Sequence, residues 1–156
     1  MNHHHYLEQT VALAVENIQK DGGPFAAMVV DADGNIVGIG QNSVTKTNDP
    51  TAHAEVLAIR DACQKLEHFQ LEGCTLYTSC EPCPMCLGAI YWARPDAVYY
   101  AATQQDAAAG GFDDAFIYEE IDKPYNQRKI PFHGLRVETT TKPFTTWNQT
   151  IHKTDY

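Results

Sequence analysis

The sequence predicts an α/β fold, a three-layer α/β/α sandwich in which a mixed sheet of about five strands lies between two layers of helices. An amphipathic helical segment opens the chain, a hairpin follows it, and helices and strands then alternate, an order typical of such a sandwich. The 156 residues are 44% hydrophobic, which is enough to form one core without disulfides. There is no repeat, low-complexity tract or linker, so we expect a single domain over residues 1–156.

The expected elements follow from apolar periodicity and from the turn and capping residues between them. The Asp-Gly-Gly-Pro sequence at 21–24 stops the first helix, and the turn at 31–35 joins the strands of the hairpin. The Asp-Pro-Thr sequence at 49–51 supplies an N-cap for the second helix, and Pro82 starts the third. The stretch 103–131 has weak periodicity, which is typical of a functional or poorly ordered segment. In order, we expect a helix over 3–20, strands over 25–30 and 36–40, a helix over 52–65, a strand over 74–78, a helix over 83–92, a strand over 97–102, a helical turn at 115–121, a strand over 135–139 and a helix over 143–153.

Charge and hydropathy exclude several classes of partner. The formal net charge is −9 and the Lys and Arg residues are scattered, so the surface repels phosphate backbones and we expect no nucleic acid partner. The apolar stretches are far shorter than the roughly 18 residues that cross a bilayer, so we expect no membrane segment. The N-terminus has neither the basic nor the apolar region of a secretory signal, and we therefore expect a cytoplasmic protein.

The five cysteines point to a metal rather than to disulfides. Three of them, Cys80, Cys83 and Cys86, follow one another with two residues between neighbours, and an odd count without a signal peptide is typical of metal ligands or reactive thiols. The isolated Cys63 and Cys74 are expected to be small core residues.

Cys83, Cys86 and His53 are the candidate metal ligands. The two thiols share one face of the expected helix, and His53 completes three legs of a tetrahedron if the two helix starts meet. Zinc suits this set because it takes thiolate and imidazole together, and three protein ligands leave the fourth position for water. The sequence therefore predicts one zinc ion.

Glu55 lies two residues after His53, a spacing that places its carboxylate beside the metal, where it can hold the proton that water gives up. In hydrolytic deamination, zinc hydroxide attacks an amidine-like ring carbon, a carboxylate carries protons to the ring and to the leaving amine, and ammonia departs. The pattern H-x-E at 53–55 followed by P-C-x-x-C at 82–86 is typical of nucleobase deaminases. These residues together predict a zinc-dependent deaminase.

A non-catalytic zinc-binding module is the alternative from a different class. It would require a closed site with Cys80 as the fourth zinc ligand, and such a site needs no carboxylate at Glu55. Because Cys80 precedes Glu81-Pro82, where the chain enters the helix from an extended geometry, we expect its thiol in the wall of the site. The run of histidines at 3–5 is better explained as an unstructured start than as a metal site.

Over essentially its whole length the chain resembles the cytidine deaminase-like superfamily, and among its members it is most similar to the short bacterial enzymes that deaminate guanine to xanthine. The resembling stretches are GGPFAAMVV (22–30), GQNSVTKTNDPTAHAEVLAIR (40–60), LYTSCEPCPMCLGAIYWARP (76–95), GGFDDAFIY (110–118) and the closing Tyr156.

The resemblance implies roles for further residues. It makes Glu55 the main proton shuttle and implies that Asp114 assists proton delivery to the leaving amine. The neighbouring Asp113 is the alternative to Asp114 in this role. It also implies a homodimer that exchanges C-terminal segments, so that Tyr156 enters the partner's site. The residues implied to bind the base are Asn42 and Asp114 through hydrogen bonds, Ala54 through its backbone N–H, and Phe25 and Trp92 through their rings.

The zinc motif does not by itself specify the base, since it is shared by deaminases of cytosine, adenine, nucleosides and tRNA adenosine. Guanine presents acceptors on one side and donors on the other, which Asn42 and Asp114 are chemically suited to pair. A tRNA enzyme needs a large positive surface, and the net charge of −9 argues against one.

Overall fold

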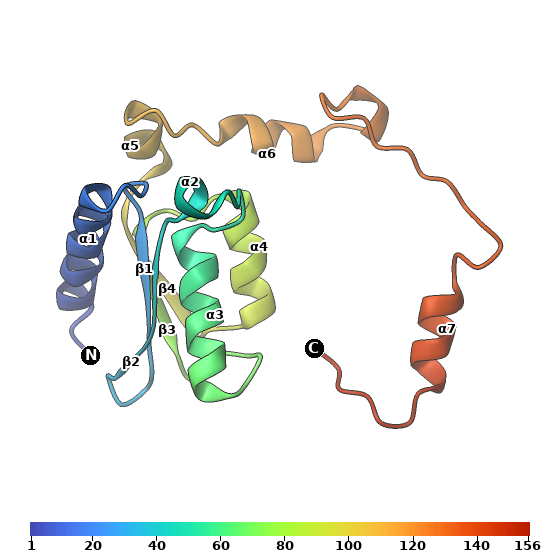
Figure 1. The fold of residues 1–156 in the computed structure, drawn as a ribbon, viewed down its shortest axis with the longest axis horizontal. Coiled ribbons are helices and arrows are strands. Elements are labelled where there is room, and N and C mark those ends of the chain that lie inside the picture. The colour runs from blue at the N-terminus through green and yellow to red at the C-terminus, as the bar shows by residue number, and fades with distance from the viewer. The chain divides into compact units, whose positions relative to one another are not determined.

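The computed structural model describes residues 1–156 and divides them into two compact units, Met1–Ala115 and Phe116–Tyr156. The first unit contains one mixed sheet with the strand order β2-β1-β3-β4 (Figure 1). β1 pairs antiparallel with β2 and with β3, whereas β3 and β4 are parallel. The strands are β1 (Ala26–Val30), β2 (Ile36–Gln41), β3 (Thr75–Cys80) and β4 (Ala97–Ala102).

Helices cover both faces of this sheet, which confirms the expected three-layer α/β/α sandwich. α1 (His3–Gln19) lies on one face, and α3 (Ala54–Leu66) and α4 (Pro84–Ala93) lie on the other (Figure 1). The strand alternation separates two cores, because neighbouring residues point to opposite faces. Leu76 packs in the core under α3 and α4, and Tyr77 packs under α1. Two short helices that the sequence analysis did not expect, α2 (Val44–Thr47) and α5 (Gln104–Ala109), complete this unit.

Two glycines of β2 bring α3 unusually close to the sheet. A Cβ atom on Gly40 would overlap the carbonyl of Ala54, and one on Gly38 would overlap the carbonyl of Ala58. The glycines are two apart on a strand and the alanines four apart on a helix, so the two small surfaces face each other. This contact determines where the first turn of α3 lies.

The second unit contains α6 (Ala115–Asp122), which begins at the boundary, a 3₁₀ turn η1 (Tyr125–Gln127) and α7 (Lys142–Gln149). The helical turn expected at 115–121 and the last helix are therefore present. The strand expected over 135–139 is not: these residues form loop and turn, and Leu135 is 87% exposed. Alternating Leu135 and Val137 predicted a strand, but a strand forms only where a second strand pairs with it.

The sheet consequently has four strands, a correction to the expected number of about five. Every helix of the protein is too short or too polar to cross a lipid bilayer. The single domain and the cytoplasmic location stay predictions.

Candidate metal centre

Two helix N-termini meet at the candidate metal site. His53 is the N-cap of α3 and Cys83 is the N-cap of α4, and neither side chain bonds the backbone of its own helix. Their ligand atoms are therefore available to a metal. Pro84 at the first position of α4 is preorganised for a helix start, and Cys86 follows within the first turn, fully buried. The partial positive charge of both helix ends favours thiolate and bound anions here.

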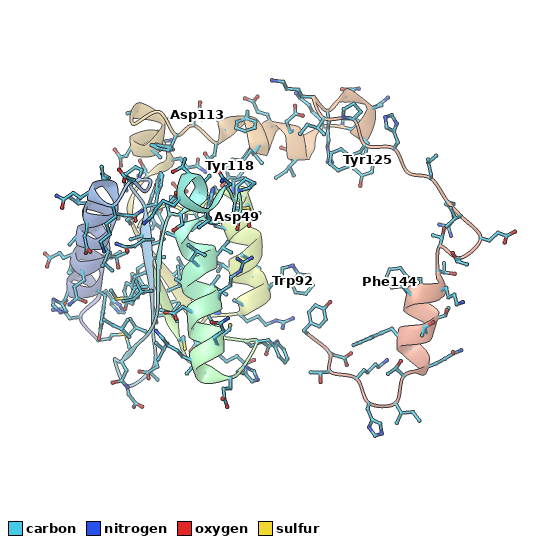
Figure 2. The ribbon with its side chains drawn as sticks, in the orientation of Figure 1. Asp49, Trp92, Asp113, Tyr118, Tyr125 and Phe144 are labelled. Atoms are coloured by element: carbon cyan, nitrogen blue, oxygen red, sulfur yellow. The ribbon has the colours of Figure 1, made fainter.

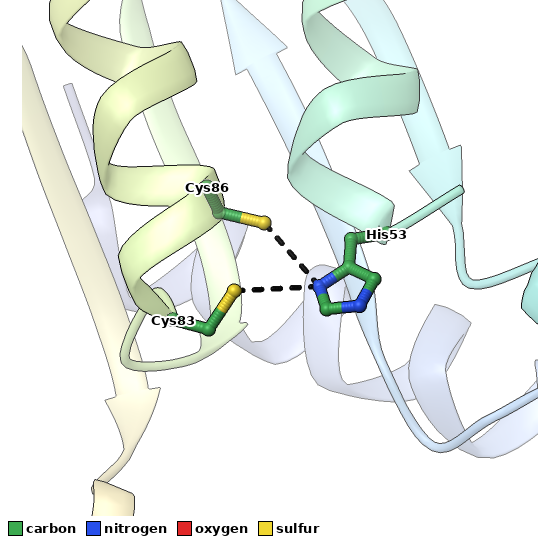
Figure 3. A group of neighbouring side chains, drawn as sticks. All are labelled: His53, Cys83 and Cys86. Atoms are coloured by element: carbon green, nitrogen blue, oxygen red, sulfur yellow. Dashed lines mark hydrogen bonds between the residues drawn. The ribbon is translucent and has the colours of Figure 1, made fainter. Parts of the chain in front are cut away.

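The geometry of these three residues fits zinc. Nδ1 of His53 lies 3.5 Å from Sγ of Cys83 and 3.5 Å from Sγ of Cys86 (Figure 3). A tetrahedral zinc ion with usual bond lengths places nitrogen and sulfur about 3.5 Å apart. All three ligand atoms lie within 4.8 Å of one another, so one ion reaches them together.

The thiols at this site differ in acidity. The hydrogen bond from Cys86 lowers the pKa of the Cys83 thiol to about 4, whereas burial raises the pKa of Cys80 to about 11. Sγ of Cys80 faces the carbonyl of Thr103 at 3.7 Å, and Cys80 is outside the group of possible ligands. The arrangement therefore supports three protein ligands and an open fourth position rather than a closed four-ligand site.

Glu55 lies in the first turn of α3 with its carboxylate beside the ligands. Only 6% of the residue is exposed, and burial raises the pKa of its carboxyl group. Oε2 is 3.4 Å from Sγ of Cys86, and Oε1 accepts a hydrogen bond of 3.1 Å from the hydroxyl of Thr78 on β3. The carboxylate is thus adjacent to the metal site without being one of the three ligands.

Phe25 and Asn42 meet at the end of the sheet where Glu55 and the candidate metal ligands lie. Phe25 precedes β1 and Asn42 follows β2, and the N–H of Asn42 donates to the Phe25 carbonyl at 3.0 Å. The end of β3 joins them, because the N–H of Ala26 donates to Oγ of Ser79 at 3.1 Å. Ala54 is the first residue of α3, whose N–H has no partner within the helix.

A buried asparagine supports this loop cluster. The side-chain amide of Asn17 on α1 donates to the carbonyls of Gly23 and Asn42, both at 2.8 Å. Asn17 is only 1% exposed, so the two bonds are shielded from water. The helix on the opposite face of the sheet therefore holds the backbone of a candidate substrate-binding residue.

Asp113 and Asp114 have different surroundings. Oδ1 of Asp113 accepts a hydrogen bond of 2.9 Å from the N–H of Ala115, the first residue of α6. Asp114 is half-buried, and its pKa is raised by burial first and further by the charge of Cys83. The charge of Cys83, one of the candidate metal ligands, therefore acts on the carboxyl group of Asp114.

Two other candidates, Trp92 and Tyr156, have largely exposed side chains. Trp92 is 62% exposed at the last turn of α4 (Figure 2), about 13 Å along the helix from Cys83 at its start. Tyr156 is 73% exposed at the end of the second unit. Their roles in the site stay predictions.

Residues 1–102 match the sequence family described as the cytidine and deoxycytidylate deaminase zinc-binding region. That span contains His53, Glu55, Cys83 and Cys86. The chain belongs to this deaminase family.

Within the deaminase family the chain is similar to three characterised or solved proteins. It is 57% identical to guanine deaminase of Bacillus subtilis over 100% of both chains, and the X-ray structure of that protein superposes with a TM-score of 0.97 over 100% of this chain and 99% of the other. A structure of guanine deaminase from Nitrosomonas europaea is 37% identical, with a TM-score of 0.67 over 70% of this chain and 63% of that one. A tRNA-specific adenosine deaminase of Aquifex aeolicus is 32% identical over 91% of each chain.

Two polar residues at or behind the candidate site, Thr78 and Asn17, were not among the residues predicted from the sequence. A signal existed for Thr78: it is two residues from Leu76 on a buried strand, so it points to the face that α3 covers. No comparable signal marks Asn17, because a lone polar residue on an apolar helix face does not reveal the loops that it bonds.

Proposed function

We propose that the protein is a zinc-dependent guanine deaminase that converts guanine and water to xanthine and ammonia. The observation that carries this proposal is the 57% identity to the Bacillus subtilis enzyme over the whole chain. The three-ligand geometry supports the same chemistry, since it leaves one position for water. Zinc bound by His53, Cys83 and Cys86 would supply Lewis-acid activation of that water.

The reaction requires two proton transfers that Glu55 is placed to carry out. The oxygen of water forms a bond to the ring carbon that bears the amine, and the carbon–nitrogen bond to that amine breaks. In the proposed reaction Glu55 accepts one proton from water and passes it to the ring nitrogen, and it then takes the remaining proton of the added hydroxyl group and passes it to the amine, which leaves as ammonia. Its raised pKa suits a group that must both take up and release a proton.

Phe25, Asn42, Ala54 and Asp114 are proposed to bind the base. The Asn42 amide and the Ala54 N–H can pair the acceptor side of guanine, and the Asp114 carboxylate can accept from its donor side. Phe25 contacts Phe112 edge to face, with ring centroids 5.0 Å apart, and offers an apolar surface to the purine. Asp114 is preferred to Asp113, because the latter is bonded at the start of α6.

We further propose a homodimer whose subunits exchange C-terminal segments, so that Tyr156 of each chain enters the site of the other copy. No residue of 116–156 is buried in the single chain. Large apolar side chains such as Ile130, Leu135 and Phe144 are more than two-thirds exposed, and Figure 2 shows Phe144 on α7. Monomeric proteins rarely expose so many apolar residues together, and β4 leaves one edge of the sheet without a partner strand.

The exchange is tested by mixing two inactive chains, Glu55→Gln and a chain lacking Tyr156. If the segments are exchanged, a mixed dimer has one site with both Glu55 and Tyr156, and activity returns after the chains are unfolded and refolded together. If each chain keeps its own segment, no site is complete and the mixture stays inactive. The mass of the wild-type protein in solution independently reports whether two chains associate.

The substrate is tested by measuring ammonia release from guanine, adenine, cytosine, their nucleosides and a tRNA anticodon stem-loop, with zinc-loaded protein. We expect guanine to be the preferred substrate. Release from the tRNA alone would support the function of the Aquifex aeolicus relative, although the net charge of −9 disfavours it. No release from any of them, with zinc bound, would contradict the enzyme assignment.

A further inference from the structure

The hydroxyl of Thr78 is a polar group of the site that none of the steps above uses. Its residue is 1% exposed on β3, and Oγ1 lies 3.1 Å from Oε1 of Glu55 and 3.0 Å from the carbonyl oxygen of Cys80. Both neighbours are acceptors, and the hydroxyl has one proton to share between them. An ionised carboxylate is the stronger acceptor, so the proton points to Glu55 whenever Glu55 is charged.

The two oxygens of Glu55 therefore have different surroundings. Oε1 is held by Thr78, and Oε2 lies 3.4 Å from Sγ of Cys86, next to the metal ligands. The terminal torsion of a glutamate has only a broad, roughly two-fold preference, so nothing within the side chain itself orients the carboxylate plane. Thr78 supplies that orientation in a place where water does not compete.

We propose that Thr78 is a positioning residue, which holds Oε1 of Glu55 so that Oε2 faces the reacting groups. The proposal rests on the proposed function of Glu55 as the proton shuttle. Proton transfer needs heavy atoms within about 2.6–3.2 Å, so a carboxylate that rotates freely spends less time in reach. Such a defect lowers kcat and leaves substrate binding nearly unchanged.

The decisive variants are Thr78→Val, which keeps the shape and removes the hydroxyl, and Thr78→Ser, which keeps the hydroxyl. We expect Thr78→Val to lower kcat for guanine roughly 10- to 100-fold with KM changed less than about twofold, and Thr78→Ser to recover most of the loss. Thr10→Val is the matched control, because Thr10 is fully buried and its hydroxyl bonds only the carbonyl of Tyr6, outside the site. It should leave kcat unchanged.

Zinc content and thermal unfolding are measured on every variant, to separate positioning from folding. Where Thr78→Val does not fold, Thr78→Ala removes the same hydroxyl without adding bulk. Full kcat in a folded, zinc-loaded Thr78→Val, or a Thr78→Ser as slow as Thr78→Val, would overturn the proposal.

A second readout does not depend on the substrate. Crystal structures of zinc-loaded wild type and Thr78→Val are compared at Glu55. A carboxylate that is rotated or adopts several orientations only in Thr78→Val supports the positioning role, and an unchanged carboxylate contradicts it. A wild type that does not deaminate guanine would overturn the proposed function, while this comparison would still decide the role of Thr78.

Discussion

Asn17 and Asn42 are 25 positions apart in the chain, and the side-chain amide of Asn17 donates a 2.8 Å hydrogen bond to the carbonyl oxygen of Asn42. The same amide donates a second hydrogen bond of 2.8 Å to the carbonyl oxygen of Gly23, so one buried side chain joins the loop before β1 to the loop after β2. The carbonyl of Gly23 also accepts from the N–H of Phe25 at 2.9 Å, whereas the bond from Asn17 is the one that holds the carbonyl of Asn42. The backbone position of Asn42, which is proposed to bind the base, therefore depends on a helix that contributes none of the proposed catalytic groups.

Replacing Asn17 with Ala is expected to lower the free energy of unfolding by about 1–3 kcal/mol, because the bonds to Gly23 and Asn42 are lost and the carbonyl of Asn42 loses its donor. KM for guanine should rise, since Asn42 is proposed to bind the base, and zinc content should not change. Urea denaturation and steady-state kinetics measure both effects. Gln19→Ala, an exposed amide on the same helix, is the control and should change neither quantity. An unaltered KM in a destabilised Asn17→Ala would separate Asn42 from substrate binding.

Gly40→Ala is expected to destabilise the protein by about 2 kcal/mol or more, because the new methyl group overlaps the Ala54 carbonyl. The start of α3 must then move, and with it His53, so zinc should also be lost at lower chelator concentrations. Gly88→Ala is the matched control. A Cβ atom there meets nothing within 4 Å, and alanine within α4 should stabilise by about 0.5–1 kcal/mol. Equal zinc retention in the two variants would argue against the role of this contact.

Glu55→Gln is expected to reduce turnover by roughly 100-fold or more while zinc content stays normal, because glutamine has the same shape but cannot carry the proton. Ammonia release and metal analysis are measured on the same sample. Glu67→Gln, an exposed position at the end of the same helix, should retain full activity. Should Glu55→Gln keep most of its turnover, another group must move the proton.

Stability of the metal-free protein should depend on pH through Glu55. Burial raises the pKa of this carboxyl above its ordinary value of 4.5, so the folded state binds the proton more tightly than the unfolded chain. The resulting stabilisation is fully present below pH 4.5 and is lost as the pH rises through the raised pKa. The unfolding free energy of wild type relative to Glu55→Gln should therefore fall with rising pH, and urea titrations across this range test it. A difference that is independent of pH would mean that Glu55 is not desolvated.

Metal removal should make Cys83 the most reactive thiol. Its pKa of about 4 leaves it as thiolate at neutral pH, whereas burial raises the pKa of Cys63 and of Cys74. After treatment with a chelator, iodoacetamide should modify Cys83 first, as peptide mass spectrometry will show. Zinc should protect it. Faster labelling of Cys63 would contradict the assigned acidity.

The strands and the three longer helices of the first unit were predictable, because each of their patterns is local, whereas the short helices α2 and α5 were not expected. Capping and turn residues placed α1, α3, α4 and the four strands within a few residues of their observed ends. The strand expected over 135–139 was wrong for the opposite reason. Apolar and polar residues do alternate in this segment, but a strand forms only if a neighbouring strand pairs with it, and the local sequence does not specify such a partner.

The sequence by itself determined the chemistry of the metal site. Cys83 and Cys86 lie at the start of one helix wherever that helix lies, and His53 with Glu55 adds the imidazole and the carboxylate that zinc hydrolysis needs. These properties follow from residue type and spacing alone.

Only the tertiary structure decided how the groups meet. Nδ1 of His53 reaches thiols 30 and 33 positions away because α3 lies against the glycines of β2 and two helix N-termini converge. The contact of Thr78 with Glu55 depends on the same packing of α3 on the sheet. Such contacts join residues far apart in sequence, and their distances are determined by sheet register and helix packing, which no local pattern encodes.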